Sequence, residues 1–145
     1  MALSLDFLAK TLLDAPVGRV EQTIQEIIKQ PVRLDVLEQE LISGTTYKRK
    51  IAISFGQIPI VHATVRFDSK RIPKLIMTEL MQKKEGIGNI LRKNNIAVQR
   101  KNLGMYVEPN GKKIIREYEI WYDNLIWFDI IEEIRLDFLN SCQNR

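Results

Sequence analysis

Two charged residues of opposite sign lie in phase with apolar side chains in segments that alternate between apolar and polar residues. If Tyr47–Phe55 is a strand, Arg49 points to its apolar face, whereas the lysines on either side of it point to the other face. If Leu125–Ile134 is also a strand, Glu132 is the only charge on its apolar face. A charge that faces a protein core is costly unless it is paired or serves a ligand. Arg49 and Glu132 therefore indicate a buried polar site.

These two residue types suit the binding of a small carboxylic acid. A guanidinium binds a carboxylate through two parallel hydrogen bonds. A carboxylate such as that of Glu132 accepts a hydrogen bond from a hydroxyl group or transfers a proton. The sequence leaves three alternatives open: Arg49 could extend along an edge strand to water, Glu132 could lie on the surface of a helix, or the two could form a buried ion pair with each other.

Other residues with useful chemistry have weaker patterns. Glu117 and Glu119 would share one face of a strand, as the carboxylate pair of a glycosidase could, but neighbours on an exposed strand are expected to be solvated. Gly86–Asn89 opens a predicted helix, whose free amides could bind an anion. His62 and Cys142 are the only residues of their types. We therefore expect no metal site and no Cys-His nucleophile, and His62 should face solvent.

Length, composition and charge limit the class of protein. The 145 residues are expected to form one domain, residues 1–145, with a sizeable core. Apolar residues make up 45% and charged residues 28%, as in ordinary globular proteins. With no apolar run of membrane-spanning length and no secretory signal, we expect a cytoplasmic chain without a membrane partner. The net charge of +4 is expected to be a solvated basic surface rather than a nucleic-acid site, since no pattern for groove binding or base stacking is present.

Hydrophobic periodicity and turn residues divide the chain into helices and strands. Helices are predicted at Leu3–Leu13, Val20–Lys29, Arg71–Lys84 and Ile87–Lys93. The third helix is expected to bury Leu75, Ile76, Leu80 and Met81. Strands are predicted from Val32 towards Leu41 and at Tyr47–Phe55, Ile58–Phe67, Leu103–Val107 and Lys113–Tyr122.

The last segment, Leu125–Ile134, fits a strand and a helix about equally well. Elsewhere the helices and antiparallel strands are segregated along the chain instead of alternating one by one. This arrangement predicts an α+β fold with a single antiparallel sheet. No feature of the sequence indicates an oligomeric state.

Several short motifs, taken in order, are similar to those of a known family. They are Leu12–Asp14 with Arg19, Pro31–Leu37, Tyr47–Ile51 with Pro59 and Ala63, Ile87–Leu91, Arg100, Arg116–Ile120, and Glu132 sixteen residues after Arg116. No single motif is specific, but their order and spacing over nearly the whole chain resemble the chorismate pyruvate-lyase (4-hydroxybenzoate synthase) superfamily. The resemblance is greatest to its small branch in cyanobacteria, red-algal plastids and archaea.

The resemblance implies a chorismate lyase-like enzyme that eliminates pyruvate from chorismate to give 4-hydroxybenzoate, with no metal and no cofactor. It implies that Arg49 binds the ring carboxylate and that Glu132 contacts the hydroxyl at the opposite end of the ring. Backbone groups near Val17 and Ile87 would complete the pocket beneath an early flap. It also favours a strand for Leu125–Ile134, in a sheet of about six antiparallel strands with helices covering one face. A plastid stroma would be the compartment of an algal member.

The chain departs from the family pattern in two regions. The flap usually reads Asp-Gly-Ser/Thr-x-Thr, whereas Asp14–Gly18 here has Ala, Pro and Val between its ends. In the last strand, Ile126, Ile131 and Ile134 stand where the family usually has Pro, Thr and Phe. The alternative is therefore a non-catalytic domain of the same fold that senses a small aromatic acid. A third hypothesis is an interaction protein that uses the basic surface.

Overall fold

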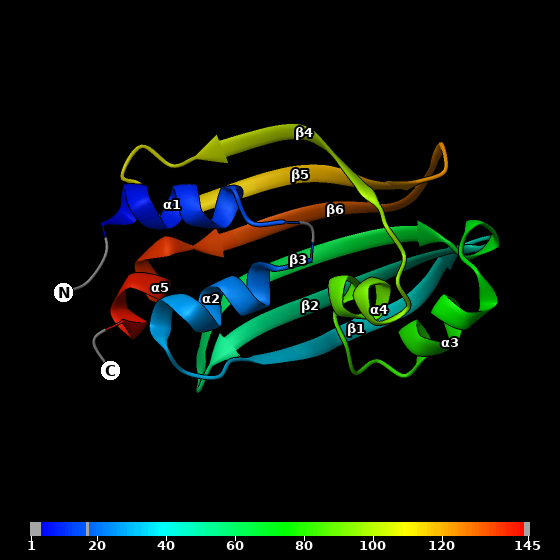
Figure 1. The fold of residues 1–145 in the computed structure, drawn as a ribbon, viewed down its shortest axis with the longest axis horizontal. Coiled ribbons are helices and arrows are strands. Elements are labelled where there is room, and N and C mark those ends of the chain that lie inside the picture. Colours follow the sequence, from blue (N-terminus) through cyan, green and yellow to red (C-terminus); the bar gives the residue numbers. More distant parts are fainter. Residues whose placement is uncertain (1–3, 17, 144–145) are drawn as a thin grey trace.

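The described residues fold into one six-stranded antiparallel sheet with the strand order β1-β2-β3-β6-β5-β4 (Figure 1). The computed structural model describes residues 4–16 and 18–143. The strands are β1 (Arg33–Ser43), β2 (Thr46–Phe55), β3 (Ile58–Asp68), β4 (Gln99–Val107), β5 (Lys113–Tyr122) and β6 (Leu125–Arg135). The helices are α1 (Leu5–Leu13), α2 (Val20–Ile28), α3 (Lys74–Met81), α4 (Ile87–Lys93) and α5 (Leu136–Cys142), with a 3-10 turn η1 (Ser69–Arg71).

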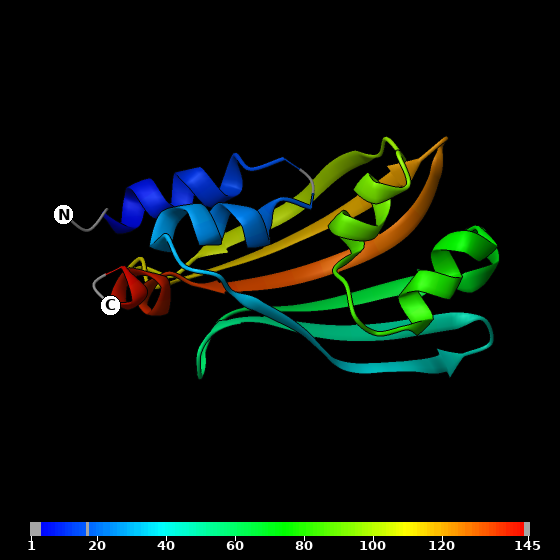
Figure 2. The ribbon, with the colours of Figure 1, turned by 60° about the horizontal axis from the view of Figure 1, so that its bottom comes forward.

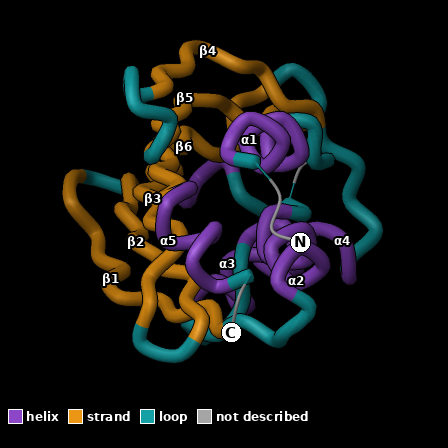
Figure 3. Tube along the Cα trace, turned by 90° about the vertical axis from the view of Figure 1, so that its left-hand side faces the viewer, coloured by secondary structure: helices purple, strands orange, loops and turns teal. Residues whose placement is uncertain are grey.

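The helices lie on one face of the curved sheet. Figure 2 shows α1 and α2 over one end of the sheet and α3 and α4 over the other, with α5 at the end that α1 and α2 cover. The view in Figure 3 shows the strands on one side and the helices on the other. The predicted fold, an α+β arrangement of about six antiparallel strands with helices on one face, is confirmed. None of the described helices has the length and apolarity needed to cross a membrane.

The ambiguous segment at the end of the sheet is a strand, β6. Phe128, Ile130 and Ile134 are buried, while Asp129 and Ile131 between them are exposed. The strand conformation prevails over the helix because β6 lies between β3 and β5 and pairs with both. A helix there would leave the backbone groups of two neighbouring strands without partners inside the protein.

Most of the predicted elements are confirmed, and the differences have local causes. The predicted hairpin joins β2 to β3 through Gly56, whose φ of +58° suits the turn. Strand β4 begins at Gln99 instead of Leu103, because pairing with β5 extends it. Helix α3 spans 8 residues, and only Ile76 and Leu80 of its four expected core residues are buried. The predictions for Leu75 and Met81 are wrong, because so short a helix presents one narrow stripe to the sheet.

The core consists of two hydrophobic clusters, one beneath each group of helices. One cluster joins α1, α2 and α5 to the sheet, and it includes Leu8, Ile24 and Ile134. The other joins α3 and α4 to the sheet, and it includes Leu80 and Phe128. The partly buried Ile51 packs against both clusters, so the boundary between them crosses the sheet near the middle of β2.

Both edge strands of the sheet are irregular. The pairing of β1 with β2 shifts register within residues 36–38 and 41–43, and that of β4 with β5 shifts within residues 102–104. An extra residue in one strand of an antiparallel pair increases the local twist and bends the strand. These shifts accompany the curvature that lets the sheet wrap around its helices (Figure 2).

The packing predicts a large difference between two neighbouring substitutions in β6. Phe128→Ala should lower the free energy of unfolding by about 3–5 kcal/mol, because Phe128 is fully buried and its removal leaves a cavity. Ile131→Ala removes an exposed side chain from the other face of the same strand and should change stability by less than about 0.5 kcal/mol. Denaturant unfolding followed by circular dichroism measures both values, and equal losses would contradict this packing.

Candidate functional site

Arg49 and Glu132 both lie on the helix-covered face of the sheet, on strands that are separated by β3. Arg49 lies opposite Val65 of β3, and Ala63, two residues along the same strand, lies opposite Glu132. Neighbouring strands are about 4.8 Å apart and two residues span about 7 Å along a strand, so the backbones of Arg49 and Glu132 are about 12 Å apart. The small side chains of Ala63 and Val65 between them leave space above the central strands.

The carboxylate of Glu132 is held through both oxygens by residues of β5. Arg116 Nε donates to Oε1 over 2.6 Å, and the Tyr118 hydroxyl donates to Oε2 over 3.2 Å. Arg116 lies directly opposite Glu132 in the strand pairing, and both side chains are buried. The alternative of a direct ion pair between Arg49 and Glu132 is therefore wrong. The charge of Glu132 is already compensated within the sheet.

The hydroxyl of Tyr118 is a fixed neutral donor. Burial raises the pKa of Tyr118, and the adjacent carboxylate of Glu132 raises it further. Tyr118 therefore keeps its proton and directs it at Oε2 of Glu132. The guanidinium carbons of Arg116 and Arg100 lie 5.1 and 5.7 Å from the centre of its ring, within the range of cation–π attraction.

Arg49 is a buried cation that is only partly satisfied. It is 0% exposed, and its Nη2 donates to the backbone carbonyl of Glu85 in the loop before α4. Its Nε and Nη1 have no hydrogen-bond partner among the described residues. Burial lowers the pKa of Arg49 to about 10, because the charged form loses water without gaining a counter-charge. At neutral pH the side chain is therefore charged and has two unused donor atoms, and a carboxylate would accept from one of them and supply the missing counter-charge.

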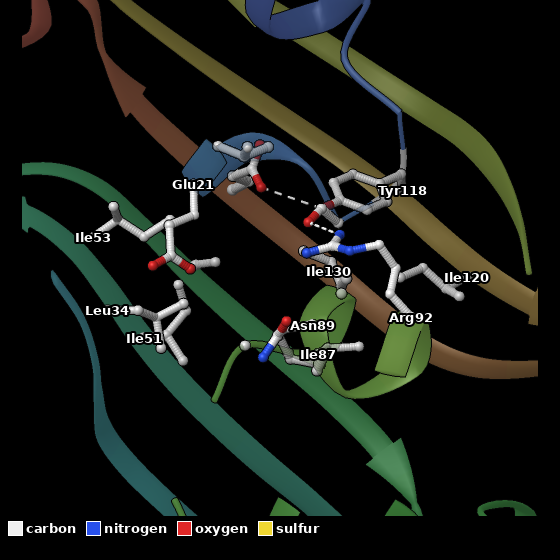
Figure 4. Close-up of a pocket in the computed structure, with 17 residues that line it drawn as sticks. Glu21, Leu34, Ile51, Ile53, Ile87, Asn89, Arg92, Tyr118, Ile120 and Ile130 are labelled. Atoms are coloured by element: carbon white, nitrogen blue, oxygen red, sulfur yellow. Dashed lines mark hydrogen bonds between the residues drawn. The ribbon is translucent and has the colours of Figure 1, made fainter. Parts of the chain in front are cut away.

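A cavity of about 90 Å³ lies beside Glu132 on the helix-covered face of the sheet, and Figure 4 shows the residues that line it. Its sheet wall consists of Leu34, Ile51, Ile53, Ala63, Val65, Tyr118, Ile120, Ile130 and Glu132. Glu132 and Tyr118 belong to the lining itself, whereas Arg49 lies beyond one end of it. Ile51 and Val65 both line that end. Ile51 is the next residue after Arg49 on the same face of β2, and Val65 is the cross-strand partner of Arg49. The cavity occupies the boundary between the two hydrophobic clusters, so its walls are mainly aliphatic.

The helical side of the cavity is closed by a very tight backbone contact. Gly18 and Gly88 both line the cavity, and a Cβ added to Gly88 would lie only 2.2 Å from Cα of Gly18. Gly18 also has a φ of +74°, which disfavours a side chain at that position. Arg92 Nη1 donates to the carbonyl of Gly18 and fixes the same contact from α4. Only glycine at both positions allows this closure.

Two further polar groups face the cavity from the helices. Glu21 in the first turn of α2 and Arg92 in α4 both line it (Figure 4). Burial raises the pKa of Glu21, and the charge of Arg92 partly opposes this change. Neither Arg92 nor Arg49 forms an ion pair with a carboxylate among the described residues, but Arg92 Nη1 donates to the carbonyl of Gly18, whereas Arg49 retains two donor atoms without a partner.

The remaining residues that the sequence singled out differ in their position relative to the cavity. Ile87, the first residue of α4, is buried and lines the cavity. Val17 lies outside the described residues. Glu117 is exposed and belongs to the open face of the sheet, and His62 is exposed as predicted.

Sequence reasoning missed the roles of Arg116, Tyr118 and Arg92. A signal for Arg116 was present, because Ile114, Arg116 and Tyr118 alternate on the buried face of β5 as Arg49 does on β2. The position of Arg92 depends on how α4 packs against Gly18, a contact between residues far apart in the sequence. Such contacts leave no periodic signal in a single sequence.

The arrangement can bind a molecule that has an anionic group at one end and a hydroxyl group at the other. The described ranges, 4–16 and 18–143, hold no cluster of three or more His, Cys, Asp or Glu side chains that could bind a metal ion. Glu132 can still accept a hydrogen bond from a ligand hydroxyl. Its other oxygen, Oε1, is occupied by Arg116 Nε.

The ion pair predicts a strongly non-additive pair of substitutions. Glu132→Met should lower the free energy of unfolding by about 3–5 kcal/mol, because Arg116 would remain buried without its counter-charge. The double variant Glu132→Met with Arg116→Met removes both charges and should recover most of that loss. Thermal and denaturant unfolding of the single and double variants test this. A double variant as unstable as Glu132→Met alone would contradict it.

The backbone contact predicts a specific sensitivity at Gly88. Gly88→Ala should destabilise the protein by about 1–3 kcal/mol, because the new methyl group would overlap the backbone of Gly18. Gly104→Ala is the matched control, since nothing lies within 4 Å of a Cβ at that position. Hydrogen exchange of the amides in α4 should increase in Gly88→Ala and stay unchanged in Gly104→Ala. Unchanged exchange in both variants would argue against this contact.

The fold, but not the sequence, resembles known proteins. No protein-family model matches this chain, and no curated protein sequence matches it. The crystal structure of PhnF from Mycobacterium smegmatis aligns over 93% of this chain and 87% of its own, with a TM-score of 0.54 and 8% identity.

Two further solved structures align less closely. They are a GntR-family transcriptional regulator from Bacillus cereus and the ligand-binding domain of a regulator described as GntR-family from Bordetella bronchiseptica. They cover 72% and 71% of this chain and 91% and 84% of their own, with 13% and 10% identity and a TM-score of 0.47 in both cases. At such low identities the likeness concerns the fold alone: this chain shares the α+β fold of PhnF.

Proposed function

We propose that this chain is a non-catalytic domain that binds a small aromatic monocarboxylate, such as 4-hydroxybenzoate, in the cavity between Arg49 and Glu132. The observation that carries the proposal is the fully buried guanidinium of Arg49, whose Nε and Nη1 have no partner within residues 4–16 and 18–143. An unpaired buried cation is costly. A ligand carboxylate would supply the missing charge and accept one of these hydrogen bonds.

The opposite end of the cavity supplies the polar group that a 4-hydroxyl would need. Tyr118 and Glu132 line that end, and among the described residues one side chain, that of Tyr118, donates a hydrogen bond to Oε2 of Glu132. A carboxylate oxygen has two lone-pair sites, so a ligand hydroxyl can donate to the second. The aliphatic walls between the two ends suit a flat apolar ring.

The dimensions of the cavity favour a compact ligand. A cavity of about 150 Å³ accommodates benzene, and the cavity here is about 90 Å³. A benzoate would therefore enter only if the cover formed by Gly18 and Gly88 moved outward. The enolpyruvyl group of chorismate would require a larger displacement still. This difference supports ligand binding over turnover.

A second candidate function is chorismate pyruvate-lyase activity. It is favoured by the placement of Arg49 and Glu132 towards opposite ends of one cavity, in agreement with the roles that the family resemblance implies. Both functions require Arg49, and they differ in what happens to chorismate.

Calorimetry with 4-hydroxybenzoate tests the proposed binding site. The wild-type protein should bind it, and benzoate should bind more weakly because it cannot donate to Glu132. Arg49→Met should weaken binding at least tenfold, a loss of about 1.4 kcal/mol, since it removes both donors. Arg66→Met, which removes an exposed cation from the open face of β3, is the matched control and should bind normally.

Incubation with chorismate separates the two candidates. The binding function predicts no 4-hydroxybenzoate by chromatography, whereas its formation by the wild type and its loss in Arg49→Met would establish the lyase instead. If the protein neither binds 4-hydroxybenzoate nor converts chorismate, both functions are rejected.

The same substitution should stabilise the protein in the absence of ligand. Because burial lowers the pKa of Arg49 to about 10 in the folded chain, below its value in the unfolded chain, its charge opposes folding throughout the range below pH 10. Arg49→Met should therefore raise the free energy of unfolding at pH 7, by about 1–3 kcal/mol. The advantage should shrink as the pH rises above 10. A variant that is less stable than wild type at pH 7 would show that Arg49 is satisfied without a ligand.

A further inference from the structure

A second cavity lies on the other side of the Arg116–Glu132 ion pair. It is a groove of about 450 Å³ between the end of α1 and strand β4. Its lining consists of Leu13, Asp14, Asn102, Leu103, Gly104, Met105 and Arg116. None of these residues lines the first cavity, so the two spaces meet the ion pair from opposite sides.

Arg116 lines this groove, and one of its buried donors has no partner among the described residues. Its side chain is 5% exposed, and its Nε is engaged by Glu132. Its Nη2 is buried and has no hydrogen-bond partner in the part of the chain that the structure describes. A buried donor left unsatisfied costs about 1–3 kcal/mol, and a hydrogen-bond acceptor in the groove would remove that cost.

The other groups of the groove define what such an acceptor would be. Arg100 lies nearby, with its Nη2 3.5 Å from the carbonyl of Leu13, so it adds positive charge near the end of α1. Asp14 adds one negative charge to the lining. A ligand with a single carboxylate would gain from Arg100 and Arg116, whereas a second negative charge would be repelled by Asp14.

The remaining surface of the groove is apolar and open to solvent. Leu103 and Met105 are 47% and 58% exposed, although both are side chains that proteins usually bury. They line the groove beside Leu13. A ligand with an apolar body would cover these side chains while its carboxylate reached Arg116.

We propose that this groove is a second small-molecule site, which takes a monocarboxylate with an apolar body. The carboxylate accepts from Nη2 of Arg116, and the apolar body packs on Leu13, Leu103 and Met105. The site does not depend on Arg49 and is independent of the function proposed for the first cavity.

Methyl NMR with benzoate as the probe tests the proposal. In protein labelled at the methyl groups of Met and Ile, the Met105 signal should shift and saturate as benzoate is added, while Met81 on α3 should not respond. Benzyl alcohol, which has no charge, and terephthalate, which has two, should each bind the groove at least tenfold more weakly. Arg49→Met should leave the Met105 response unchanged, even if it removes the response of Ile51 in the first cavity.

Substitutions of exposed residues on β4 complete the test without disturbing the buried ion pair. Leu103→Glu places a negative charge in the groove and should weaken the Met105 response at least tenfold. Tyr106→Glu adds the same charge to an exposed neighbour in β4 that does not line the groove and should leave the response unchanged. The proposal is overturned by the absence of a Met105 response, by its loss in Arg49→Met, or by equal effects of Leu103→Glu and Tyr106→Glu. If Met105 responds while Ile51 does not, only the function proposed for the first cavity fails.

Discussion

The ion pair between Arg116 and Glu132 is the interaction on which the polar interior of this protein depends. It places two charges on adjacent strands near the middle of the sheet, at positions that would otherwise hold apolar side chains. Because the two charges compensate each other, Glu132 can line one cavity while Arg116 lines the other. The pair thus divides the concave face into two polar environments, and the orientation of Tyr118 follows from it.

Arg49 differs from Arg116, because its charge is buried without a counter-charge. The two hydrophobic clusters do not merge where the cavity separates them, and Arg49 lies beyond one end of that space. A core that closed fully would be more stable, since it would bury more apolar surface. The retained gap and the retained cation are local departures from efficient packing. Such departures are typical of binding sites, where stability is given up for affinity.

The sequence predicts much of this fold because alternation directly reports which face of a strand is buried. That signal predicts the hairpin and places Arg49 on the concave face. For β6, whose pattern also fits a helix, the pairing with β3 and β5 decides in favour of the strand. The partners of these charges were not predictable in the same way. Which carboxylate meets Arg116, and that Arg49 meets only the backbone of Glu85, depend on strand order and loop path. Periodicity within one segment carries no information about either.

The register shifts of the two edge strands bear on the behaviour of the protein at high concentration. An open sheet ends in two rows of backbone donors and acceptors that another chain could pair with. In β1 and β4 these rows are interrupted within residues 36–38, 41–43 and 102–104. A regular strand paired with either edge would therefore lose its hydrogen-bond register after a few residues. Protection of this kind lets β4 keep Leu103, Met105 and Tyr106 at the surface without inviting continuous edge-to-edge growth. The irregular edges thus oppose fibril formation by a chain that exposes apolar side chains on its edge strand β4.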